Sequence, residues 1–184
     1  MTATEDLRAE HEGIRVMLRI LAKVCETLES GKKVDQNHLE GIIEFLTVFA
    51  DKCHHGKEEE MLFPELEKSG ISKDRGPIGV MLSEHDEGRG FVRGMKEGVG
   101  KIKAGGPFAA TQFTGSARKY IDLLSRHIDK ENDVLFPMAD EVLSKETQDR
   151  LRENFETLER VKIGAGKHEE FHALIHQLKG VYLS

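Results

Sequence analysis

The sequence predicts an all-α fold: an up-down four-helix bundle over about residues 3–143, with an additional C-terminal helical segment over about residues 144–183. Apolar residues recur at three- and four-residue steps along most of the chain, and the strict alternation typical of half-buried strands is absent. Glycine- and proline-containing breaks separate four long patterns of this kind, and long helices joined by short loops pack as antiparallel neighbours. We therefore expect residues 1–184 to form a single domain.

The first half of the predicted bundle contains two helices. The inward face of the first helix comprises Leu7, Ile14, Leu18 and Leu21, widened by Ile20 and Val24. Residues 30–37 (SGKKVDQN) interrupt this pattern. A second helix is predicted over about residues 37–68, and its inward residues are Ile42, Phe45, Leu46 and Phe49.

The second half repeats this organisation after a loop at residues 69–77. A third helix is predicted to start near Pro77, which a first helical turn tolerates, and to fade at residues 104–107 (AGGP). A fourth runs from about Phe108 to Val142. Ser144 can cap a fifth helix, and the GAG stretch at residues 164–166 predicts a break before a last short helix.

Three glycines, Gly90, Gly94 and Gly98, lie four residues apart on the third predicted helix. Such a stripe of small residues predicts the close approach of a neighbouring helix. A channel for a small molecule is the alternative interpretation.

The composition excludes several classes of protein. Charged residues make up 33% of the chain, the net charge is −6 and both signs are interspersed, so no basic surface for nucleic acid is indicated. No apolar run is long enough to cross a bilayer, and the N-terminus lacks a signal-peptide pattern, so we expect a cytoplasmic protein that does not bind membranes. The two cysteines, Cys25 and Cys53, do not have the spacing of metal ligands.

Two stretches share one pattern. HHGKEEEMLFP (residues 54–64) and HIDKENDVLFP (residues 127–137) both read His, three residues, Glu, and then Leu-Phe-Pro. A similar relation links LRAEHEG to MLSEHDEG, which contain His11 and His85. Each half of the chain therefore has a lone histidine on its first helix and a His-x-x-x-Glu pair on its second. The separations within the halves, 43 and 42 residues, place both sets at one level of a bundle.

The four-residue spacing puts the histidine and the glutamate on one face of a helix, one turn apart. His54 and Glu58 continue the inward line of the second helix, whereas His55 and Glu59 follow a polar line. We therefore expect His54 and Glu58 to face the interior and His55 and Glu59 to lie behind the ligands or toward solvent. On that interpretation a His55→Ala variant keeps most of its metal.

Taken one at a time, each of these residues has a simpler explanation that needs no metal. A single His–Glu pair on a helix is usually a surface pair, and a lone histidine on an apolar face is usually a satisfied core residue. Here four histidines and two glutamates are all expected inside, where unpaired polar groups cost several kcal/mol. This duplicated set favours a metal site.

At these residues the sequence resembles the hemerythrin-like family of HHE cation-binding domains. The resemblance covers the chain from His11 to about Phe136, through His54, Glu58, His85, His127 and Glu131. It implies a four-helix bundle around a non-haem di-iron centre with an oxo or hydroxo bridge. The histidines would cap the two irons, and Glu58 and Glu131 would bridge them.

Two departures from the oxygen-carrying members stand out. Those proteins have His-x-x-x-His on the third helix, where this chain has His85 followed by Arg89, and an Asp on the fourth helix, where it has Glu131. The site thus resembles the broader bacterial branch of the family, which includes proteins for the repair of iron centres. His168, in GKHEEFHALIHQL, is a candidate seventh ligand; the alternative is that it belongs to a solvated stripe of surface histidines.

Ligand type alone does not choose the metal, since imidazole binds Zn, Cu, Fe and Ni. Structural zinc prefers four ligands, commonly including Cys, so six ligands in two matching sets fit a dinuclear site better. That the metal is iron is what the resemblance implies. Three functions remain open from the sequence. The chain could bind or sense O2, NO or peroxide; it could be an enzyme that reduces them or repairs iron centres; or it could store iron or act as a scaffold.

Overall fold

Local sequence signals define the ends of the helices in the computed structural model, which describes residues 2–106 and 108–184. Helix α1 (Ala3–Glu29) begins at a capping box in which the Thr2 side chain accepts from the backbone N–H of Glu5. Asp35 caps α2 (Gln36–Glu44), and α4 (Pro77–Lys103) carries Pro77 in its first turn. Met1 and Pro107, the last residue of the break expected at residues 104–107, lie outside the described part.

The second and fourth helices of the bundle are composite. The second consists of α2, the π-helical segments η1 (Phe45–His55) and η2 (Glu58–Leu62), and α3 (Phe63–Lys68). The fourth consists of α5 (Ala109–Lys130), the π-helical segment η3 (Glu131–Leu135) and α6 (Phe136–Val142). A π turn has i→i+5 hydrogen bonds and holds more residues than an α turn, so it changes which side chains share a face.

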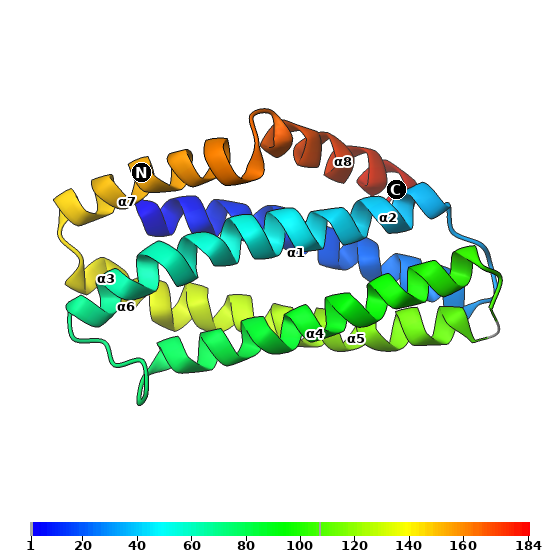
Figure 1. The fold of residues 1–184 in the computed structure, drawn as a ribbon, viewed down its shortest axis with the longest axis horizontal. Coiled ribbons are helices and arrows are strands. Elements are labelled where there is room, and N and C mark those ends of the chain that lie inside the picture. The colour runs from blue at the N-terminus through cyan, green and yellow to red at the C-terminus, as the bar shows by residue number, and fades with distance from the viewer. Residues whose placement is uncertain (1, 107) are drawn as a thin grey trace.

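Four long rods run roughly side by side (Figure 1): α1, the α2–α3 rod, α4, and the α5–α6 rod. No strand occurs in residues 2–106 or 108–184. The predicted all-α bundle is therefore confirmed, and its four rods match the four predicted helical patterns closely.

The C-terminal segment lies along the outside of the bundle, over α1 and the α2–α3 rod (Figure 1). Ser144 caps α7 (Lys145–Leu158) as predicted, and a π-helical segment η4 (Glu159–Ile163) leads to the break. Gly164 and Gly166 both have positive φ, a conformation that favours glycine, and α8 (Lys167–Tyr182) follows. Phe155 of α7 and Phe171 of α8 are buried, so this segment extends the core.

In the part of the chain that the structure describes, the core consists of two apolar clusters, one toward each end of the rods. One contains Ile14, Ala50, Met95 and Ile128, and the other contains Leu7, Leu62, Met81 and Leu135. In the first three rods, the clustered site residues fall between members of the two clusters; in the fourth, Glu131 does so and His127 directly precedes Ile128 of the first cluster. The buried histidines and glutamates therefore form a polar layer enclosed by apolar side chains on both sides.

Close helix approach explains two of the three glycines on α4. A Cβ atom on Gly98 would lie 2.9 Å from the backbone of Phe113, and one on Gly94 would lie 2.4 Å from Ser116 Oγ. A Cβ on Gly90 would meet only the end of the Arg93 side chain, at 3.7 Å. The stripe therefore allows α4 and α5 to approach each other at Gly94 and Gly98 and does not line a channel there.

This packing makes Gly98→Ala destabilising. The new methyl group would force α4 away from α5, and we expect a loss of about 1–3 kcal/mol in the free energy of unfolding. Gly100 lies two residues after Gly98 on the same helix, and a Cβ atom built on it has no neighbouring atom within 4 Å. Gly100→Ala should therefore stabilise the protein by about 0.5–1 kcal/mol through helix propensity. Urea unfolding of both variants measures the two changes, and equal effects of the two substitutions would contradict the packing argument.

No helix in the described part of the chain is both long and apolar enough to span a membrane.

Candidate metal centre

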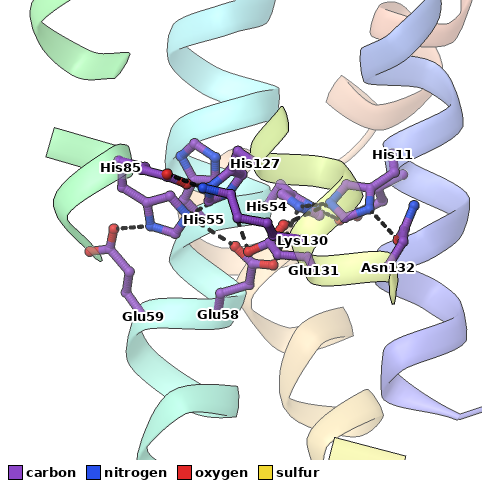
Figure 2. Close-up of polar contacts among 12 residues, drawn as sticks. His11, His54, His55, Glu58, Glu59, His85, His127, Lys130, Glu131 and Asn132 are labelled. Carbon is purple, nitrogen blue, oxygen red and sulfur yellow. Dashed lines mark hydrogen bonds and ion pairs between the residues drawn. The ribbon is translucent and has the colours of Figure 1, made fainter. Parts of the chain in front are cut away.

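Six of the seven residues predicted as ligands meet in the polar layer of the bundle (Figure 2). They are His11 from α1, His54 and Glu58 from the second rod, His85 from α4, and His127 and Glu131 from the fourth rod. None of these side chains is more than 1% exposed. The duplicated pattern in the sequence thus corresponds to one buried cluster with contributions from all four rods.

The first group of ligand atoms forms around His11 and His54. The Nε2 atoms of these two rings lie 2.9 Å apart. Glu131 Oε2 lies 3.2 Å from the Nε2 of His11, and Glu58 Oε1 lies 3.5 Å from the Nε2 of His54. Two imidazole nitrogens and two carboxylate oxygens therefore converge on one point.

A second group forms around His85 and His127, whose Nε2 atoms are 3.1 Å apart. Glu58 Oε2 lies 3.4 Å from the Nε2 of His85, and Glu131 Oε1 lies 3.2 Å from the Nε2 of His127. Each glutamate therefore turns one oxygen toward each group. A carboxylate placed in this way is suited to bridge two cations.

Four carboxyl or amide groups stand behind the four histidines and accept hydrogen bonds from their Nδ1–H groups. The acceptors are Glu10 for His54, Glu84 for His127, Glu59 for His85 and Asn132 for His11, at distances of 2.7–2.9 Å. An acceptor at Nδ1 fixes the tautomer, so the lone pair of each Nε2 points into the cluster. This is the arrangement of histidines that ligate metals.

Cations neutralise the carboxylates behind the histidines. Lys57 donates to Glu10, Lys130 donates to Glu84, and Arg89 donates to Glu59 at 3.1 Å. Burial alone would raise the pKa of Glu10, but the hydrogen bond from His54 and the charge of Lys57 lower it to about 2. The pKa values of Glu59 and Glu84 are also lowered by their hydrogen bonds to the histidines. These groups are therefore ionised acceptors at neutral pH.

The sequence could have revealed part of this supporting set. Glu10 and Glu84 directly precede His11 and His85, and Lys57 and Lys130 directly precede Glu58 and Glu131. The repeated unit is thus Glu-His followed by His-x-x-Lys-Glu. Glu10 of the first rod accepts from His54 of the second, and Glu84 of the third rod accepts from His127 of the fourth. The position of a glutamate on its own helix does not predict which neighbouring rod it contacts.

The repeated Leu-Phe-Pro also has a structural explanation. The Phe136 ring stacks on His11 with 5.5 Å between centroids, and the Phe63 ring lies parallel to His85 at 6.1 Å. The prolines that follow stand in the first turns of α3 and α6. Each phenylalanine therefore packs on the lone histidine of the other half of the chain.

His55 lies inside the bundle, next to the second group of ligand atoms. Its side chain is 4% exposed, and its ring stacks on that of His85 with 3.8 Å between centroids. One of its nitrogens lies within 4.8 Å of ligand atoms of Glu58, His85 and His127. Of the two places expected for His55, behind the ligands or toward solvent, its burial excludes the second. Because η1 is π-helical, its wider turn brings His54 and His55 to the same interior.

His168 does not join either group. It lies on α8 at the outside of the bundle, with its ring 5.4 Å from Phe49 and 4.6 Å from His172. Its closest candidate ligand partners are Glu10 and Glu159, and the Lys57 ammonium donates to both of these carboxylates. The structure therefore places His168 one carboxylate away from the cluster, behind His54.

Five atoms at the cluster have no hydrogen-bond partner although they are buried. They are Nε2 of His55 and both carboxylate oxygens of Glu58 and of Glu131. Burying polar atoms without a hydrogen-bond partner in a protein interior is unfavourable. All five atoms and the facing lone pairs of the histidines fit cations bound within the two groups.

Comparison with known proteins supports the same conclusion. The model of the family described as "Hemerythrin HHE cation binding domain" matches residues 2–139. The chain belongs to this family. The predicted resemblance is therefore confirmed, and the match includes all six clustered residues.

Several curated relatives of this hemerythrin-family chain share one name, "Iron-sulfur cluster repair protein YtfE". Those from Escherichia coli O157:H7, Escherichia coli O1:K1 and Escherichia fergusonii are each 31% identical to it over 141 residues. The alignment covers 71% of this chain but only 64% of the relatives. No solved structure gives a significant match.

The charges of this hemerythrin-type cluster predict opposite effects of pH on the metal-free and metal-bound forms. Burial opposes protonation of His127, but the Glu131 carboxylate outweighs it and raises the pKa of His127 to about 10; the pKa values of His54 and His85 are also raised. A raised histidine pKa stabilises the fold below the unfolded value of 6.5, and this contribution is lost as the pH rises toward 10.

We therefore expect the metal-free protein to lose stability steadily between pH 6.5 and 10. Metal binding requires neutral histidines and releases protons, so the affinity of the protein for metal should rise over the same pH interval. Thermal unfolding of both forms at several pH values measures the difference in Tm, which should widen as the pH rises. A metal-free protein that becomes more stable from pH 6.5 to 10 would contradict the assigned charges.

Proposed function

We propose that the cluster holds two iron ions and that the protein binds or responds to O2, NO or peroxide. The observation that carries this proposal is the division of two buried carboxylates between two groups of imidazoles. On this proposal His11 and His54 would hold the first ion, His85, His127 and His55 would hold the second, and Glu58 and Glu131 would serve both. Mixed imidazole and carboxylate ligands suit iron, and the names of the curated relatives concern iron-containing cofactors.

When bound, a pair of reduced iron ions with an open position supplies the electrons and the coordination site for a small oxidant. The protein residues orient the ligands and control access of water to the site. The carboxylates behind the histidines hold the rings in place, and the apolar clusters above and below the layer exclude bulk water.

The two positions differ in a way that favours ligand binding at one of them. At the residue after the His-x-x-x-Glu histidine, the first stretch has His55 and the second has the core residue Ile128. The first group therefore has two imidazoles and the second has three. Behind the lone histidines stand the neutral amide of Asn132 and the carboxylate of Glu59. We infer that the His11–His54 position keeps more open coordination.

A second candidate function is enzymatic: reduction of peroxide or NO, or repair of damaged iron centres. The shared name of the curated relatives favours repair, although the chain spans about two thirds of their length.

One set of measurements separates these functions. Protein expressed with iron should contain about two ions per chain and, when oxidised, show near-ultraviolet charge-transfer absorption. Mixing the reduced protein with O2, NO or peroxide then distinguishes a stable adduct from rapid oxidation with turnover. Protein that binds zinc or no metal under these conditions would refute the proposal.

A further inference from the structure

A cavity of about 200 Å³ opens between η1 and α4. Its apolar walls include Leu46 and Val92, and Tyr120 of α5 also lines it. His55 and Arg89 line it on the side nearest the metal centre. The cavity is large enough for a molecule of a few heavy atoms.

The charge of this lining is opposite to that of the whole chain. Arg89, Arg93 and Lys96 contribute three cations, against the single carboxylate of Asp51. Asp51 is already paired with Arg89 at 2.9 Å. Arg93 and Lys96 are exposed and form no ion pair with any residue of the described chain. A net charge of −6 for the chain makes this local excess of positive charge unusual.

Four other cavities in the described part of the chain lack this excess. In three of them the lining contains more Asp and Glu than Lys and Arg. In the fourth the numbers of acidic and basic residues are equal. The cavity beside Glu10, for example, is lined by four carboxylates, of which Glu156 and Glu159 are two, and by Lys57 as the single Lys or Arg. A positively lined cleft with apolar walls raises the local concentration of anions.

The inner end of the cavity is one imidazole ring away from the second ligand group. The ring of His55 lines the cavity, and the same ring stacks on His85 and lies close to Glu58 and His127. Arg89 completes this wall and donates hydrogen bonds to Asp51 and Glu59. Asp51 lies next to Nδ1 of His55, and Glu59 lies next to Nδ1 of His85. An anion in the cavity would therefore rest against side chains that position two of the imidazoles.

We propose that this cavity is a docking site for small monovalent anions, drawn in by Arg93 and Lys96, from which they reach the centre past His55 and Arg89. The docking step stands on the cavity alone, whereas the passage to the centre rests on the proposed di-iron function. The half-buried hydroxyl of Thr47, which also lines the cavity, can donate a hydrogen bond to such an anion.

Stopped-flow binding of azide to the oxidised iron protein tests the passage. The double variant Arg93→Gln/Lys96→Gln should bind azide about tenfold more slowly at low ionic strength and lose most of the salt dependence of the rate. Lys119→Gln, which removes one exposed charge outside the cavity, should leave the rate unchanged. Binding of neutral NO to the reduced double variant should also be unchanged. Wild-type azide rates in the double variant would overturn the proposal.

Crystals of the metal-free protein soaked in iodide test the docking step without the iron. Anomalous density should appear in the cavity of the wild-type protein and be absent from the double variant. A cavity without iodide in the wild type overturns the proposal whether or not the protein binds iron, while failure to bind iron refutes only the proposed function.

Discussion

Glu58→Ala is expected to abolish binding at both metal positions, because this carboxylate faces both groups of imidazoles with a different oxygen. Removing a histidine affects one group, but removing Glu58 takes a ligand from each. We expect the iron content to fall from about two ions per chain to less than about half an ion. Metal analysis after expression with iron measures the change.

Glu60→Ala is the matched control, since Glu60 lies on the same π-helical segment but is exposed and paired with Lys162. It should retain its iron, and circular dichroism should show both variants folded. Two ions per chain in folded Glu58→Ala would mean that this carboxylate does not join the two positions.

His55→Ala should lower the affinity for metal at the His85–His127 position by at least about tenfold. The structure leads to this expectation because the buried Nε2 of His55 has no protein partner and faces that group. Helical phase alone predicted the opposite, that His55→Ala keeps most of its metal. Titration of the metal-free variant with Fe2+ under anaerobic conditions measures the affinity of each position.

Two other histidines serve as controls for this experiment. His176 is exposed on α8, and His168 lies outside both groups, so alanine at either position should leave both affinities unchanged. Wild-type affinities in His55→Ala would show that its ring only packs on His85. A loss of metal in His168→Ala would restore the sequence-based prediction that His168 is a ligand.

The sequence was sufficient to predict the four rods and the cluster of six residues because both depend on repeated, local patterns. Apolar periodicity defined the helices, and the 73-residue offset between His54 and His127 placed two matching halves at one level. The matching separations within the halves made convergence of the six side chains a geometric consequence of antiparallel packing.

Other features of the site depend on deviations from a regular α-helix or on contacts between rods. The burial of His55 follows from the π-helical turn of η1, for which the sequence offers no clear signal. The roles of Glu10 and Glu84 depend on which rod each faces, although the repeated Glu-His pairs mark their positions. Arg89 stands where oxygen-carrying relatives would have a histidine, and only the structure shows it joining Asp51 to Glu59.

We propose that one buried layer of the bundle holds two iron ions between five histidines and two shared glutamates. Anomalous diffraction at the iron edge from crystals of the iron-loaded protein tests it most directly. The account predicts two peaks, one beside His11 and His54 and the other beside His85 and His127, each in contact with a different oxygen of Glu58. A single peak, or peaks outside this layer, would contradict it.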